Sequence, residues 1–98
     1  FNRGEKMKLV IRKYTGSGAK ELFDIIAHNM DSLNKTMESI PGLDTYSAAL
    51  TENGGITITV CQDENGIRES IKRAKDWVAE HAGKVQVEVP QIMYGDLL

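Results

Sequence analysis

The sequence has little of several residue types, and each shortage excludes a class of protein. Its 98 residues include one cysteine, Cys61, which excludes an internal disulfide and leaves no Cys or His pattern typical of a zinc site. Twelve Lys and Arg stand against 14 Asp and Glu, for a net charge of −2. We therefore expect neither nucleic-acid nor membrane binding, and no apolar run reaches the ~20 residues that a transmembrane helix needs.

The rest of the composition is typical of one soluble globular domain. Hydrophobic residues make up 41% and charged residues 27% of the chain. The first residues, FNRGEK, are polar, so no signal peptide is expected, and a single cysteine fits a reducing cytoplasm. We predict that residues 1–6 form a disordered or non-native extension and that residues 7–98 form the domain.

Hydrophobic periodicity predicts six secondary-structure elements. Alternating apolar residues indicate strands, and apolar residues at steps of three or four indicate two amphipathic helices. Pro41-Gly42 ends the first helix, and Asn53-Gly54 predicts a two-residue type I′ turn. The elements are a strand at 7–14, a helix at 19–39, strands at 43–51 and 55–62, a helix at 67–82 and a strand at 85–89, before an apolar tail after Pro90.

This order predicts an α+β fold. Two consecutive β-α-β units give a ferredoxin-like protomer, an antiparallel four-stranded sheet with two helices on one face. After the predicted turn, apolar residues alternate with small or weakly polar ones: Ile56, Ile58 and Val60 against Thr57, Thr59 and Cys61. We expect the small polar set on the helix-free face, where a second subunit or a ligand would meet it.

Two apolar surfaces of this fold need a cover. One is the helix-free sheet face, and the other is the tail after Pro90. A two-fold homodimer covers both if the sheets face each other and the tails reach across. The tail residues concerned are Ile92, Met93, Tyr94, Leu97 and Leu98.

The sequence resembles one structural superfamily over residues 7–98. The resemblance lies in the helix–Pro-Gly–strand–Asn-Gly–strand–helix plan, the segment IPGLDTYS and the last strand with its apolar tail. These features are similar to the dimeric α+β barrel superfamily, which includes antibiotic-biosynthesis-type monooxygenases and haem-degrading enzymes. The resemblance implies a homodimeric barrel without fixing the activity, because one fold hosts many functions.

Several residues are candidates for a ligand site. Arg12, Tyr14, Asp44 and Tyr46 would line a pocket inside the barrel, where Tyr and Arg would orient a polar aromatic molecule, or the two tyrosines would pack at the dimer interface. Cys61 is expected to be a small buried spacer rather than a nucleophile, because no basic group lies near it in sequence. With Thr57 and Thr59 as further wall residues, the candidate site contains Arg12, Tyr14, Tyr46, Thr57, Thr59, Cys61, Trp77 and His81.

Trp77 and His81 lie one helical turn apart. The resemblance to haem-degrading enzymes implies an Asn on the first strand beside a Trp and a helical His, and residues 7–14 contain no Asn. The structural interpretation places Trp77 at the edge of the core and His81 near a helix C-terminus. We therefore predict no cofactor and no metal.

No catalytic motif stands out, so three functions remain open. The first is an uncharacterised homodimeric barrel that binds a small hydrophobic or aromatic molecule between the sheets. The second is a cofactor-independent monooxygenase acting on a phenolic or polycyclic substrate. The third is a structural or stress-related dimer without catalysis.

Overall fold

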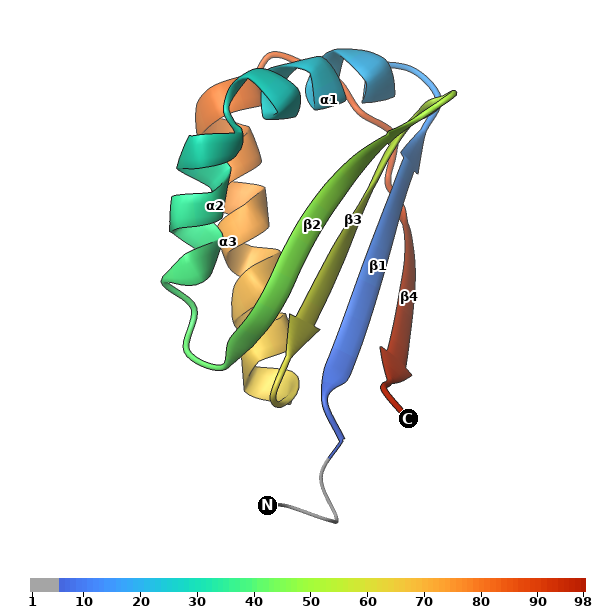
Figure 1. The fold of residues 1–98 in the computed structure, drawn as a ribbon. Coiled ribbons are helices and arrows are strands. Elements are labelled where there is room, and N and C mark those ends of the chain that lie inside the picture. The colour runs from blue at the N-terminus through green and yellow to red at the C-terminus, as the bar shows by residue number, and fades with distance from the viewer. Residues whose placement is uncertain (1–5) are drawn as a thin grey trace.

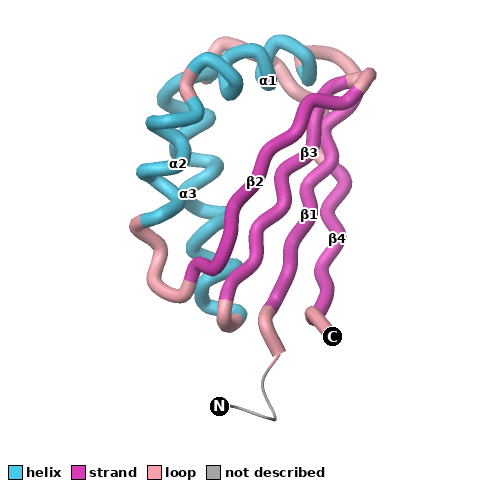
Figure 2. Tube along the Cα trace, in the orientation of Figure 1, coloured by secondary structure: helices cyan, strands magenta, loops and turns pink. Residues whose placement is uncertain are grey.

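The computed structural model describes residues 6–98, so all but Lys6 of the predicted extension lies outside the described residues. Strands β2, β3, β1 and β4 form, in this order, one antiparallel sheet, and three helices pack on one face of it (Figure 1; Figure 2). The predicted ferredoxin-like α+β fold is confirmed. The elements are β1 (Lys8–Thr15), α1 (Ala19–His28), α2 (Met30–Glu38), β2 (Leu43–Thr51), β3 (Gly54–Cys61), α3 (Glu64–Ala82) and β4 (Gln91–Asp96).

The described helices include none that is both long enough and apolar enough to cross a membrane.

The predicted first helix is two helices, α1 and α2, separated at Asn29. The backbone of Asn29 leaves the helical region at φ −130° and ψ 26°, and its side-chain amide donates to the Ile25 carbonyl at 2.7 Å. Such a local bond competes with the helical ladder. The chain bends there, and α1 lies across the top of the sheet while α2 runs beside α3 (Figure 1). The apolar stripe continues from α1 into α2, so hydrophobic periodicity alone did not predict the break between the two helices.

The hairpin between β2 and β3 is real, but the predicted turn is wrong. Thr51 pairs with Gly54, so the two loop residues are Glu52 and Asn53. Asn53 has a negative φ, which excludes the predicted type I′ geometry. Gly54 lies in β3, where a Cβ would come within 2.2 Å of the Tyr14 carbonyl oxygen. Glycine is needed at this position for close packing within the sheet.

The fourth strand lies six residues later than predicted. Residues 85–89 form no strand, although Val85 and Val87 pack against the core. The predicted tail supplies β4 instead, and β4 pairs with β1 from Lys8–Asp96 to Lys13–Gln91. The alternating valines correctly predicted a segment with one buried side. They wrongly predicted that this segment pairs with β1, because residues 91–96 pair with that edge of β1 instead.

The predicted orientation of β3 is reversed. Thr57 pairs with Arg12, and Thr59 pairs with Val10 and Tyr46, and all of these face the helices. Cys61 is fully buried on the same side. The alternate residues face the side that the described helices leave uncovered, together with their neighbours on the other strands: Leu9, Ile11, Ile56, Ile58, Val60 and Met93.

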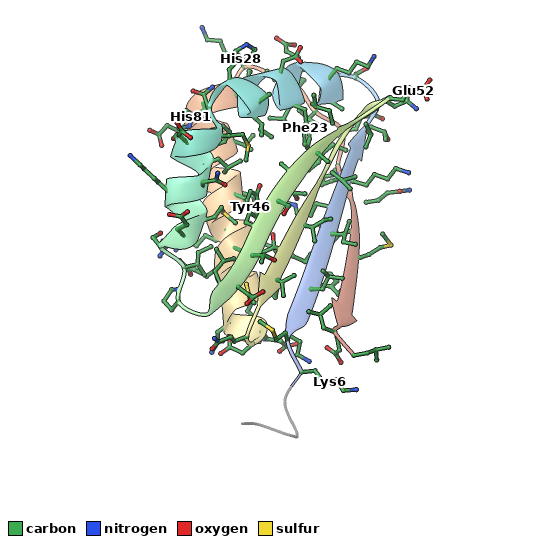
Figure 3. The ribbon with its side chains drawn as sticks, in the orientation of Figure 1. Lys6, Phe23, His28, Tyr46, Glu52 and His81 are labelled. Carbon is green, nitrogen blue, oxygen red and sulfur yellow. The ribbon has the colours of Figure 1, made fainter. Side chains whose placement is uncertain are left out.

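The reversal has a steric cause. Helix α1 inserts the Phe23 ring against β3, where a Cβ added to Gly55 would lie 2.2 Å from the ring. The rings of Phe23 and Tyr14 pack with centroids 5.4 Å apart. Because these large side chains share the layer with Arg12, β3 must present small residues there. Figure 3 shows Phe23 between α1 and the sheet.

Candidate functional site

Five of the eight predicted site residues surround one small cavity between the sheet and the helices. Arg12 and Tyr14 come from β1, Tyr46 from β2, Thr57 from β3 and Trp77 from α3. Tyr46 lies on the helix side of β2 (Figure 3). The cavity has a volume of about 10 Å³, enough for roughly one water molecule. Apolar residues complete its wall: Leu22, Ile26, Leu33, Ala74 and Val78.

Arg12 is the unusual member of this set. Its side chain lies in the middle of β1, the residue is only 8% exposed, and its Nε has no hydrogen-bond partner among residues 6–98. The ion pairs found among residues 6–98 do not include it. The guanidinium carbon lies 5.6 Å from the centroid of the Tyr14 ring, a cation–π distance. A buried donor without a partner is costly, which makes Arg12 a candidate for binding a ligand.

The two tyrosines beside Arg12 are protonated at neutral pH. The pKa of Tyr46 is raised to about 12, mainly by burial and also by nearby Tyr14, against the lowering effect of the positive charge of Arg12. Burial also raises the pKa of Tyr14, again against the effect of Arg12. Both phenols are therefore neutral and can donate a hydrogen bond to a ligand.

A larger groove adjoins the cavity. It has a volume of about 480 Å³ and shares Arg12, Tyr14, Leu22 and Val78 with the cavity. The second half of α3 and residues 83–90 form its other walls, and we call it the 83–90 groove. Its lining is mainly apolar, with charged groups only at Arg12, Lys75 and Glu88. The cavity and this groove together form the candidate site.

Trp77 and His81 do not act together at the cavity. Trp77 is buried, and its indole N–H donates to the Ser32 hydroxyl at 3.1 Å. His81 is exposed, stacks on the Trp77 ring with centroids 4.2 Å apart, and directs Nδ1 at the Trp77 carbonyl oxygen at 3.0 Å. It does not line the cavity. Within residues 6–98 no three His, Cys, Asp or Glu side chains gather as metal ligands.

The two remaining predicted residues lie beside the site rather than in it. Thr59 is buried between Tyr46 and Val10 and lines neither the cavity nor the 83–90 groove. Cys61 packs in a separate cluster with Val10 and Ile67 at the far end of β3. Burial raises the pKa of its thiol, and the charges of two nearby aspartates raise it further. Cys61 is fully buried, and its raised pKa disfavours the thiolate form that a nucleophile needs.

The sequence reasoning missed the residues of the 83–90 groove. Lys75, Val85, Val87 and Glu88 line it, and the valines were assigned to a strand. Their period-two pattern is genuine, because Val85 and Val87 turn inward while Gln86 and Glu88 are exposed. A possible signal was Pro90, which has no backbone N–H and favours the end of a strand over its interior.

Comparison with known proteins matches the fold. No protein-family model matches the sequence, and no curated protein matches it. Three solved structures, each covering at least 96% of this chain, match closely in shape. MupZ from Pseudomonas fluorescens has 9% identity and a TM-score of 0.71, with 70% of its own chain covered. The ActVA-Orf6 monooxygenase of Streptomyces coelicolor, in complex with Nanaomycin D, has 9% identity, a TM-score of 0.66 and 91% coverage.

The third structure is NE2512, a protein of unknown function from Nitrosomonas europaea, with 18% identity, a TM-score of 0.67 and 93% of its chain covered. The chain also shares its fold with two structures described as putative antibiotic biosynthesis monooxygenases, from Bordetella bronchiseptica (11% identity, TM-score 0.70) and Caulobacter crescentus (19% identity, TM-score 0.67). The resemblance expected from the sequence is thus confirmed for the fold. At identities this low the likeness shows the fold alone, and the activity must be argued from the site.

Proposed function

We propose that this protein binds a small organic molecule between the sheet and the helices of each protomer. The observation that carries this proposal is the meeting of Arg12, Tyr14, Tyr46, Thr57 and Trp77 at a cavity that adjoins a 480 Å³ groove. That volume is within the range of small-molecule sites, which are mostly apolar with a few polar groups for orientation. The sequence-based hypothesis placed the ligand between two sheets, but the residues that would hold it face the helices.

We also propose that the protein is a homodimer through its uncovered sheet face. This face carries Leu9, Ile11, Ile56, Ile58 and Met93, and none of the described helices covers it. The centre of this face is apolar, with the polar Lys13, Thr45 and Ser47 beside it, and an uncovered apolar patch of this kind is typical of an association surface. The same face of a second copy is self-complementary under two-fold symmetry, and strand β4 contributes to it through Met93.

The binding proposal has a direct test in Trp77, the single tryptophan of the chain. Its indole N–H gives one assignable NMR signal at the wall of the cavity. A library of neutral and charged aromatic fragments should shift this signal saturably, and Val87→Phe, which fills the groove, should weaken the shift. Ala27→Phe on the exposed surface of α1 is the matched control. If no fragment shifts the signal, a structural dimer without a ligand is the better account.

Monooxygenase activity without a cofactor is the second candidate function. It is favoured by the fold shared with the ActVA-Orf6 monooxygenase and by two neutral phenols beside a buried cation, which would orient a phenolic or polycyclic substrate away from water. Oxygen consumption with a panel of phenols and hydroxyanthracenes tests it. Oxygen consumption should disappear in Tyr46→Phe or Arg12→Gln. If the phenols bind but no oxygen is consumed, the protein binds its ligand without oxidising it.

A further inference from the structure

Arg12 brings a permanent positive charge into the layer between the sheet and the helices. An arginine does not lose its proton at physiological pH. Its Nε has no acceptor, and no carboxylate among residues 6–98 forms an ion pair with it. Its backbone position is fixed on both sides, because β1 pairs with β3 at Thr57 and with β4 at Ile92. The cation is therefore held in place without a counter-charge.

The other charged groups of the 83–90 groove do not supply that counter-charge. Glu88 is the one carboxylate that lines the described groove, and its Oε2 accepts the Ser17 backbone N–H at 3.1 Å. Its carboxylate lies against Gly16, where an added Cβ would overlap it, and so it is turned toward the loop between β1 and α1. Lys75 adds a second cation that forms no ion pair within the described residues. The groove thus has an excess of positive charge.

We propose that the 83–90 groove binds a small organic carboxylate, with the carboxylate on Arg12 and an apolar body along the groove. The planar guanidinium presents paired N–H donors that match the two oxygens of a carboxylate. The apolar body would lie against Leu22, Val78, Val85 and Val87. This inference names the ligand class of the proposed function and rests on it.

The dimensions of the two spaces fix how such a ligand would lie. The cavity of about 10 Å³ is too small for a ring, whereas the groove of about 480 Å³ accommodates one or two fused rings. Arg12 and Tyr14 line both spaces, so the carboxylate belongs at their junction. The phenols of Tyr14 and Tyr46 are protonated and can add hydrogen bonds to its oxygens.

A matched pair of probes tests the inference. 2-Naphthoate and 2-naphthamide have nearly the same shape and differ in charge. Titration at neutral pH, followed by calorimetry and by the indole signal of Trp77, should show naphthoate binding at least about tenfold more tightly, as expected for a hydrogen bond to a charged group. This comparison uses the unmodified protein, so it does not depend on whether an Arg12 variant folds.

Substitutions then locate the preference. Arg12→Gln should remove the preference for naphthoate, and Arg12→Lys should keep part of it, because a lysine retains the charge without the paired donors. Lys75→Gln should lower the affinity for naphthoate less than Arg12→Gln does. Arg68→Gln, on an exposed part of α3 outside the site, should change nothing.

The outcomes separate this inference from the proposed function. Equal affinities for naphthoate and naphthamide, with no effect of Arg12→Gln, would overturn the carboxylate site while leaving a ligand site in place. If neither probe shifts the Trp77 signal and the fragment library also fails, both the inference and the proposed function fall. A naphthoate preference that survives Arg12→Gln but is lost in Lys75→Gln would overturn the role given to Arg12.

Discussion

The two faces of the sheet each depart from a simple inside–outside rule. The face that the helices cover carries polar residues, among them Arg12, Thr57 and Thr59, which are all buried. The uncovered face carries Leu9, Ile11, Ile56 and Ile58. A buried polar residue and an exposed apolar patch are the informative exceptions in a folded protein. Here they occur on opposite faces of the same strands, which suggests a ligand site on one face and an association surface on the other.

The largest expected loss of stability lies on the helix-covered face. Phe23→Ala should lower the free energy of unfolding by about 3–5 kcal/mol, because Phe23 is fully buried against Tyr14 and Gly55 and its loss leaves a cavity. Chemical denaturation measures this change. Leu50→Ala, at a largely exposed residue of β2, should cost less than about 0.5 kcal/mol. Similar losses at the two positions would show that the helix layer is not a tightly packed core.

The uncovered face should respond through association. Ile58→Glu would place a charge in the centre of the proposed interface and should weaken the dimer at least about 100-fold, as burying an unpaired charge costs several kcal/mol. Sedimentation should show about twice 10.9 kDa for the unchanged protein and a single chain for the variant. Ala27→Glu on the exposed surface of α1 controls for the added charge. A monomeric unchanged protein would contradict the proposed interface.

Arg12 should reveal a conflict between stability and binding. Replacing a buried charge that lacks a partner by an apolar residue of similar length often stabilises a protein. Arg12→Met should therefore raise the free energy of unfolding by about 1–2 kcal/mol in the absence of ligand, while naphthoate binding is lost. Arg73→Met, which removes a partly exposed pair with Glu69 and a hydrogen bond to the Ser39 hydroxyl, should instead cost about 0.5–1 kcal/mol. Destabilisation by Arg12→Met would mean that the guanidinium supports the fold.

The last effect, which is absent at neutral pH, concerns Tyr46 at high pH. Its pKa is about 12 in the folded protein and near 10 when unfolded, so the folded state keeps the proton longer. The stabilisation from the neutral phenol is complete below pH 10 and is lost as the pH rises through 12. The Tyr46→Phe variant should therefore lose less stability than the unchanged protein between pH 10 and pH 12. Chemical denaturation at a series of pH values measures the free energy of unfolding of both proteins. Identical pH profiles would contradict a buried, neutral Tyr46.

The sequence predicted the order of the elements and the class of fold but not which face of β3 is covered. Alternation defines two faces of a strand, and the packing of distant residues decides between them. Phe23 against Gly55 is such a contact, joining α1 to β3. The bend at Asn29 escaped for a different reason, because a side-chain hydrogen bond interrupts the helix without interrupting its apolar stripe.

The candidate site was partly predictable. Arg12, Tyr14 and Tyr46 of the predicted group do lie together at the cavity, with Trp77, but on the helix side of the sheet. Asp44 of the same group is exposed and does not line the cavity. His81 was joined to Trp77 by helical spacing, yet it stacks on the outer part of the ring and remains exposed. The 83–90 groove depends on where β4 begins, and that is set by pairing with β1 over a long separation in sequence.

One measurement tests the division of roles between the two faces most directly. Nuclear Overhauser effects between bound 2-naphthoate and the methyl groups of the protein report which face the ligand touches. The account predicts contacts from the naphthalene protons to Leu22 and Val78, which line the groove, and none to Ile56 or Ile58 on the uncovered face. Contacts to the two isoleucines, with none to Leu22 or Val78, would place the ligand between sheets and contradict it.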